Sequence, residues 1–190
     1  MVLGNNWCNV ASYEDCLRLR AERLNDPTFR GLLKLLRAAD VDPANCFFTN
    51  VYMGLLDHAS SLASFPEDAG FQARCVAFLM EQIHVVKPRT ILALGTEPMA
   101  ALAKVLPPLR AWLGARGGSR SFAEIDRANS GVVRVAVDGA AIVCVGLTHP
   151  SMTNSRLRKF GDKHGAAAEV AMVREAVSSP PSGPGCRGRG

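Results

Sequence analysis

Residues 141–151, which read Ala-Ile-Val-Cys-Val-Gly-Leu-Thr-His-Pro-Ser, decide how this chain folds. The apolar, β-branched run that ends at Leu147 predicts a buried strand. His149 and the proline after it follow that strand directly, where open α/β sheets place their ligand crevice. Because histidine is the side chain best able to donate a hydrogen bond or a proton near neutral pH, His149 is a candidate functional residue. Taken alone, it could equally be a residue that merely ends a strand.

Strand patterns and helix patterns alternate along the rest of the chain. Further strands are expected at residues 1–3, 45–51, 90–94 and 132–137, the last joined to 141–147 by a turn at Asp138-Gly139. Helices are expected at residues 13–24, 27–39, 66–86, 97–106, 108–113 and 162–177, with Ser12 and Asp26 as caps of the first two. This alternation predicts an α/β fold, a three-layer α/β/α sandwich whose central sheet is mainly parallel.

The composition is typical of a soluble protein with one folded domain. The 190 residues are 48% hydrophobic and 21% charged, which is ordinary for a globular chain. We expect the domain to span residues 1–177 and the Pro/Gly/Arg-rich tail at 178–190 to be disordered. Neither a run of about 18 apolar residues nor a signal peptide is present, which favours a cytoplasmic protein without a membrane span. A monomer is the default expectation.

The cysteines predict neither a disulfide framework nor a metal centre. All six stand apart in the sequence, without a Cys-x-x-Cys pair and without the Cys/His spacing of metal ligands. In a chain of this length, such scattered cysteines are expected to be reduced thiols. We therefore expect no bound metal and no other cofactor.

Polar side chains follow several of the expected strands. In a parallel sheet the carboxyl ends of the strands lie along one edge, which here would carry Asn5, Asn6, Asn50, Gly95 and His149. Asparagine both donates and accepts hydrogen bonds, so it can read the polar edge of a nucleobase. The same residues are also common in turns and at strand ends, where they bind only loop backbone. Their joint occurrence at one edge predicts a polar pocket.

The excess of positive charge permits a polyanionic partner. The net charge is +5, but basic proteins often bind no nucleic acid. A cluster of basic residues just beyond His149 says more, because Asp162 is its one acidic neighbour; the cluster is Arg156, Arg158, Lys159 and Lys163. Two interpretations stay open for it: contacts with phosphate groups beside the pocket, or the solvated start of a helix.

Short segments stand in an order and spacing that one enzyme family shares. They are Gly4–Asn9, Phe47–Val51, Cys75–Leu79, Lys87–Gly95 and His149–Ser151, with Phe29 between the first two. Together they resemble the uracil-DNA glycosylase superfamily over most of residues 1–175. The layout is closest to the iron–sulfur branch of that superfamily, in which an aromatic side chain placed like Phe29 stacks on the base.

This resemblance implies a DNA-repair enzyme that hydrolyses the N-glycosidic bond of uracil, or of another deaminated base, flipped out of single- or double-stranded DNA. By the matching positions, Asn6 would orient the attacking water and His149 would stabilise the departing base. The residues implied in binding the flipped base are Asn5, Trp7, Phe29 and Asn50. Those implied in contacting the DNA are Ser151, Met152, Arg156, Arg158, Lys159 and Lys163.

The chain departs from the family pattern in two respects. Trp7 stands where a proline is usual, and Asn6 is an amide that cannot act as a strong general base, so we expect modest turnover. Gly54 occupies the place of a cluster cysteine, and of the cluster positions only Cys75 matches. With too few thiolate ligands, an iron–sulfur cluster is not expected.

Two other classes of protein remain as alternatives. A non-catalytic module could recognise a nucleotide or a nucleic acid with the same pocket. A small-molecule α/β enzyme could use the edge for a phosphorylated metabolite, although the sequence has neither of the Gly-rich phosphate-binding motifs and no nucleophile elbow.

Overall fold

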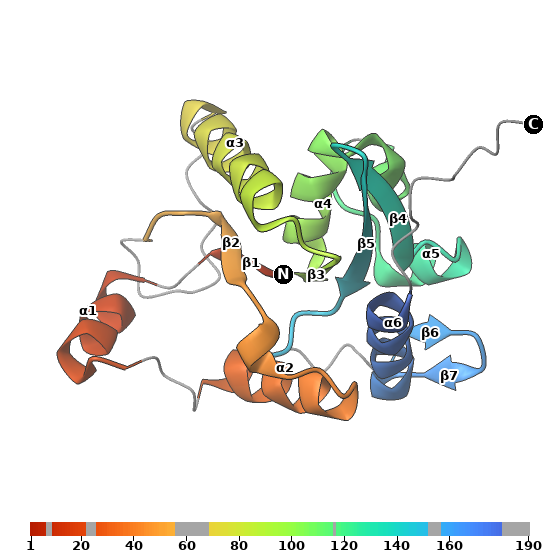
Figure 1. The fold of residues 1–190 in the computed structure, drawn as a ribbon, viewed down its shortest axis with the longest axis horizontal. Coiled ribbons are helices and arrows are strands. Elements are labelled where there is room, and N and C mark those ends of the chain that lie inside the picture. The colour runs from red at the N-terminus through yellow and green to blue at the C-terminus, as the bar shows by residue number, and fades with distance from the viewer. Residues whose placement is uncertain (7–8, 22–25, 56–68, 116, 152–156, 180–190) are drawn as a thin grey trace, which may run out of the picture.

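A five-stranded sheet forms the centre of the molecule (Figure 1). The computed structural model describes residues 1–6, 9–21, 26–55, 69–115, 117–151 and 157–179. The strands are β1 (Val2–Asn6), β2 (Phe48–Tyr52), β3 (Thr90–Leu94), β4 (Val132–Val137) and β5 (Ala140–Leu147). Their order is β2-β1-β3-β5-β4, in which β4 alone pairs antiparallel. The predicted, mainly parallel sheet is therefore confirmed.

Helices cover both faces of this sheet. The α-helices are α1 (Val10–Leu19), α2 (Pro27–Ala38), α3 (Ala69–Val86), α4 (Thr96–Val105), α5 (Phe122–Arg127) and α6 (Ala166–Ser178). Two short 3₁₀ helices lie at Pro43–Asn45 and Pro107–Trp112, and a small hairpin is formed by β6 (Lys159–Phe160) and β7 (Lys163–His164). In Figure 1, α3 and α4 lie on one side of the sheet and α2 and α6 on the other. This is the expected three-layer α/β/α arrangement.

Side-chain alternation along the strands divides the core into two clusters. Leu3 packs with Leu79 of α3 and Leu102 of α4. Its neighbour Val2 belongs to the opposite cluster, with Leu36 of α2. Because successive side chains of a strand point to opposite faces, a strand covered on both sides reads as a continuous apolar run. This explains why β3 and β5 are so clearly visible in the sequence.

Most local predictions hold, and the exceptions have identifiable causes. The turn between β4 and β5 has positive φ angles at Asp138 (51°) and Gly139 (78°), as a type I′ hairpin turn requires. The last helix was expected to begin at residue 162, which is wrong. Residues 159–164 form the β6–β7 hairpin instead, because Gly161 and Gly165 adopt positive φ angles of 56° and 62° that no helix continues through.

Helix ends were the least well predicted features. The cap of α1 is Asn9, whose side-chain oxygen accepts from the Ser12 backbone N–H, so Ser12 is not the cap. Helix α5 was not predicted, although Ser121 and Glu124 form a capping box at its start, a signal that the sequence does contain. Helix α6 reaches Ser178, and Ser179 accepts a hydrogen bond from Arg134. The rest of the predicted tail, 180–190, lies outside the described residues.

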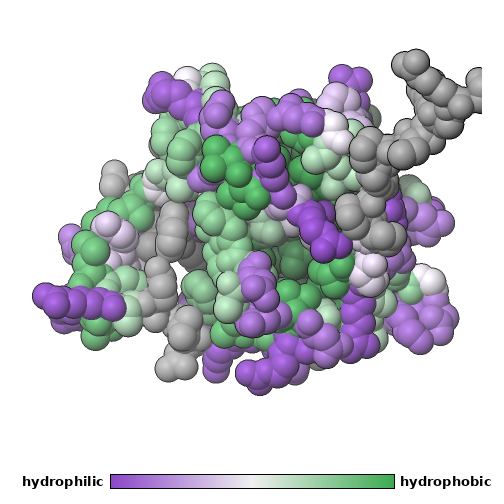
Figure 2. Space-filling model, viewed as in Figure 1, coloured by the Kyte–Doolittle hydropathy of each residue, from purple (hydrophilic) through white to green (hydrophobic). Residues whose placement is uncertain are grey.

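The solvent-facing surface of α2 and α6 is predominantly polar. In Figure 2 the lower border of the molecule, over α2 and α6, is mainly hydrophilic. Within the described part of the chain, none of the helices is long and apolar enough to cross a bilayer.

Candidate nucleobase site at the carboxyl edge of the sheet

The strand ends that sequence reasoning singled out lie on one edge of the sheet. Strand β1 ends at Asn6, and β5 leads into His149. Strand β3 lies between them and is followed by Gly95, where an added Cβ would lie 3.6 Å from the Cβ of His149. Since neighbouring strands are about 4.8 Å apart, β1 and β5 are separated by roughly 10 Å. Strand β3 fills this interval, so the end of β1 and His149 lie on either side of the end of β3.

The side chain of Asn50 lies across β1 at Gly4. The two residues face each other in the β1–β2 register, and a Cβ at Gly4 would overlap the Oδ1 atom of Asn50. Only glycine leaves the amide this space. By alternation, Asn50 and Asn6 share the face that carries Val2, which is the face covered by α2. Asn50 thus lies within β2, inside the strand expected at residues 45–51, whereas Asn5 and Asn6, which were expected after the first strand, are the last residues of β1.

Asn5 approaches the same edge from the opposite face. Strand alternation places it on the side of Leu3, which is covered by α3 and α4. Its Oδ1 atom is buried and has no hydrogen-bond partner among the described residues. A buried acceptor without a partner is uncommon and is often completed by a ligand or a water molecule. Asn5 and Asn6 are therefore adjacent in sequence but are directed to different sides of β1.

The imidazole of His149 is half-buried and held by a neighbouring hydroxyl. Its Nδ1 atom lies 2.8 Å from the Oγ atom of Ser151. Burial lowers the pKa of His149 below its ordinary value, and the negative charge of Asp26 opposes this shift. The ring is therefore neutral at pH 7. When Ser151 donates its proton to Nδ1, the Nε2 atom carries the remaining hydrogen and can donate it.

We expect His149 to titrate below the ordinary histidine pKa of about 6.5. Because the folded state then binds fewer protons than the unfolded chain, the free energy of unfolding contributed by this group is complete above about pH 6.5 and declines as the pH falls through the lowered pKa. An NMR titration of the imidazole protons, with His149→Gln to assign the signal, measures the shift. A midpoint above 6.5 would contradict the burial of the ring.

Helix α2 packs against the segment that carries His149. A Cβ at Gly31 would lie 2.5 Å from the carbonyl oxygen of Pro150, so the absence of a side chain at Gly31 permits the contact. The N-cap of this helix is Asp26, whose carboxylate accepts from the Thr28 N–H at 2.7 Å. Phe29 lies one turn from this end and is partly buried. Its position near the start of α2 brings it to the same end of the sheet as His149.

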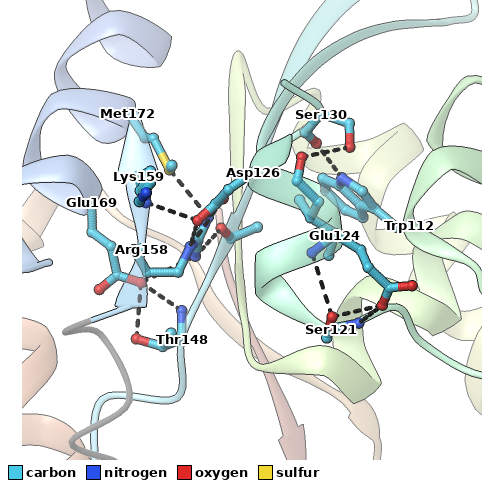
Figure 3. A network of polar contacts seen from close by, with 12 residues as sticks. Trp112, Ser121, Glu124, Asp126, Ser130, Thr148, Arg158, Lys159, Glu169 and Met172 are labelled. Atoms are coloured by element: carbon cyan, nitrogen blue, oxygen red, sulfur yellow. Dashed lines mark hydrogen bonds and ion pairs between the residues drawn. The ribbon is translucent and has the colours of Figure 1, made fainter. Parts of the chain in front are cut away.

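One predicted DNA contact is wrong, because Arg158 has no exposed surface. Its guanidinium group is held between two carboxylates, those of Asp126 and Glu169 (Figure 3). The sequence showed a basic cluster but not that one of its members is enclosed by acidic groups from α5 and α6. A charge paired in this way cannot reach a phosphate.

The other predicted DNA contacts divide into exposed residues and residues that cannot be placed. Lys159 and Lys163 are exposed on the β6–β7 hairpin, and Ser151 is exposed beside His149. Trp7, Met152 and Arg156 lie outside the described residues.

Two features of this end of the molecule were missed in the sequence. Arg30, Lys34 and Arg37 are exposed at positions i, i+4 and i+7 of α2 and form a basic stripe, a periodicity that the sequence does display. Burial is the main cause that raises the pKa of Tyr52. The negative charge of Glu97, exposed in the first turn of α4, raises it further. Tyr52 pairs with Asn6 in the sheet register, so Glu97 brings a carboxylate near this edge.

Most of the chain matches a known protein family. Residues 25–171 match the model of the uracil DNA glycosylase superfamily. No curated protein matches the chain. The matched range includes Phe29, Asn50 and His149 but begins after Asn5 and Asn6, so the first motif rests on its resemblance alone. Because the match covers more than half of the 190 residues, the chain belongs to the uracil DNA glycosylase superfamily.

Proposed function

We propose that this protein hydrolyses the N-glycosidic bond of uracil, or of another deaminated base, flipped out of DNA. Membership of the superfamily supports a DNA glycosylase in general. Two observations support the finer proposal: the carboxamide of Asn50 lies beside Gly4 of β1, and the half-buried imidazole of His149 lies beside Gly95, which follows β3. These two groups match the two needs of the reaction, which are to read a pyrimidine edge and to stabilise its departure.

Base recognition is assigned to groups on both sides of the flipped ring. Extruding a base costs a few kcal/mol, and stacking on Phe29 returns about 1–3 kcal/mol. A two-point contact from the Asn50 amide discriminates between uracil and cytosine by about 1–3 kcal/mol. Asn5 offers a buried acceptor that has no other partner among the described residues. Trp7 retains its assignment to base binding from the sequence.

The chemical step is assigned to His149 and Asn6. As the glycosidic bond breaks, its electron pair moves to the pyrimidine, and negative charge grows on the base carbonyl. A neutral His149 donating from Nε2 stabilises this charge in the transition state. Asn6 orients the water that attacks the sugar carbon, but its amide takes up no proton. Modest turnover is the expected consequence.

DNA binding is assigned to exposed polar and basic groups. Ser151 contacts His149, Lys159 and Lys163 are exposed on the β6–β7 hairpin, and the basic stripe of α2 lies on the helix that packs on Pro150. Met152 and Arg156 retain their assignment from the sequence. Contacts of this kind position the duplex without reading its sequence, and they weaken as salt concentration rises.

The proposal is tested by incubating the purified full chain with single- and double-stranded oligonucleotides that contain uracil, hypoxanthine or xanthine. Alkaline cleavage then reveals abasic sites. Strand breaks at the modified position, and none in thymine-containing controls, are the expected result. Binding that is sensitive to salt but leaves no abasic product would replace this proposal with the non-catalytic module.

Gly4→Ala is expected to lower uracil release by about 10–100-fold, the loss of an amide contact worth roughly 1–3 kcal/mol. The new methyl group would overlap Oδ1 of Asn50, and the flexible amide would rotate away while the sheet remains folded. Single-turnover kinetics measure the effect. Gly118→Ala is the matched control, because a Cβ there meets no atom within 4 Å. Equal rates for the two variants would show that the position of Asn50 does not matter.

A further inference from the structure

A buried network of charged groups binds two residues on either side of His149 in the sequence, Thr148 and Arg158. Both residues bind the carboxylate of Glu169 on α6 (Figure 3). The Oε1 atom of Glu169 accepts from the Thr148 N–H at 2.7 Å, from the Thr148 hydroxyl at 2.8 Å and from Arg158 Nη1 at 3.2 Å. One buried oxygen atom thus binds the residue directly before the candidate catalytic residue and also Arg158, further along the chain.

The cation of this network is itself held on several sides. Arg158 donates from Nε and Nη2 to the carboxylate of Asp126 at 3.0–3.2 Å, and from Nη1 to the Gly146 carbonyl at 2.9 Å. Its guanidinium carbon lies 4.5 Å from the centre of the Phe122 ring. The side chains of Arg158, Asp126 and Glu169 are 0%, 3% and 8% exposed. Charge-assisted hydrogen bonds between side chains that are so deeply buried are strong and keep a fixed geometry.

The peptide groups before and after His149 are constrained as well. The carbonyl of Leu147 accepts from the Gly95 N–H at 2.7 Å, and Thr148 is bound twice by Glu169. On the other side, Pro150 packs on Gly31 of α2. The backbone position of His149 is therefore set by contacts that its own side chain does not make.

We propose that Glu169, acting through Thr148, is a positioning residue that sets where the imidazole of His149 stands. The buried charges of the network do more than stabilise the domain. Because Glu169 of α6 binds the residue next to His149, the position of α6 also determines the position of the imidazole. A displacement of about 1 Å in such a group costs as much as 100-fold in rate. The kinetic test of this inference rests on the proposed function. The spectroscopic test requires only the imidazole of His149.

Thr148→Val tests the proposal with the mildest change. Valine has nearly the shape of threonine but removes the hydroxyl bond to Glu169 and leaves the backbone bond. We expect kcat for uracil release from a uracil-containing oligonucleotide to fall about tenfold, with KM little changed. Thr148→Ser restores the hydroxyl and should return the rate to near the wild-type value. Glu169→Gln is the second variant: its amide oxygen accepts more weakly from Thr148, so kcat should fall by a smaller factor than in Thr148→Val.

Asp126→Asn is the control for stability. It weakens the other side of the Arg158 ion pair but leaves the Thr148–Glu169 contact in place. At a temperature where all variants are folded, it should retain wild-type kcat even where its melting temperature is as low as that of Thr148→Val. Equal losses of kcat in the two variants would overturn the proposal and leave the network a purely structural role.

The pKa of His149, followed by NMR, provides a readout that does not depend on activity. In Thr148→Val the imidazole should become more solvated, which moves its pKa upward toward the ordinary value, whereas Asp126→Asn should leave it where it is. A wild-type chain that releases no base would refute the proposed function, yet this titration would still decide the positioning role. An identical titration in Thr148→Val and wild type, with no change in kcat, would overturn the inference.

Discussion

His149→Ala is expected to slow uracil release by about 100–1,000-fold, which is the usual effect of removing one preorganised donor to a developing negative charge. The half-buried, neutral ring is proposed to donate to the carbonyl of the departing base, and alanine leaves only water in its place. Binding to DNA with intact bases should change little, because the imidazole interacts mainly with the transition state. Single-turnover assays with enzyme in excess measure the chemical step.

His84→Ala is the matched control for this prediction. His84 lies 3.5 Å from Asp138 in the β4–β5 turn, at the opposite edge of the sheet from His149. Its removal should leave the rate of base release unchanged. A His149→Ala variant that keeps the wild-type rate, or a similar loss in both variants, would remove His149 from the chemical step.

Arg158→Ala is expected to lower the free energy of unfolding by about 3–5 kcal/mol. The guanidinium group is fully buried between Asp126 and Glu169, and its loss would leave two buried carboxylates without their cation. Urea denaturation followed by far-UV circular dichroism measures the change as a lower midpoint at constant slope. A loss of this size is a large fraction of the stability of an ordinary domain.

Arg18→Ala is the corresponding exposed substitution. Arg18 pairs with Asp15 on α1 at 2.7 Å, but its side chain is 75% exposed. Solvent and salt screen such a pair, so its loss should cost less than about 1 kcal/mol. If Arg158→Ala destabilised the protein no more than Arg18→Ala, the buried network would not have the electrostatic importance that its geometry indicates.

The strands and the site edge could be predicted from sequence because they depend on short-range patterns. The apolar run before Thr148 and the Asp138-Gly139 turn express local preferences of the backbone, and both are present in the structure. The positions of Asn6 and His149 at one edge follow from the rule that parallel strands end together. Helix α5 was predictable as well, since Ser121 and Glu124 form a capping-box pattern at its start.

The burial and the contacts of individual side chains could not be predicted from the sequence. Arg158 reads as one more surface cation in a basic segment, and only its contacts with Asp126 and Glu169 reveal a buried charge. In the same way, nothing local to Gly4 shows that the amide of Asn50 lies over it. Each of these facts depends on residues that are distant in sequence.

By itself, then, the sequence determined the class of the fold, the order of the strands along the chain and the edge at which function is expected. Tertiary structure alone decided that the Oδ1 atom of Asn5 is buried, that Arg158 is enclosed, and that Glu169 binds both Thr148 and Arg158. The physical reason is one of range. Periodicity and turn preference act between near neighbours, whereas burial of a charge or of an amide is set by segments that meet only when the chain has folded.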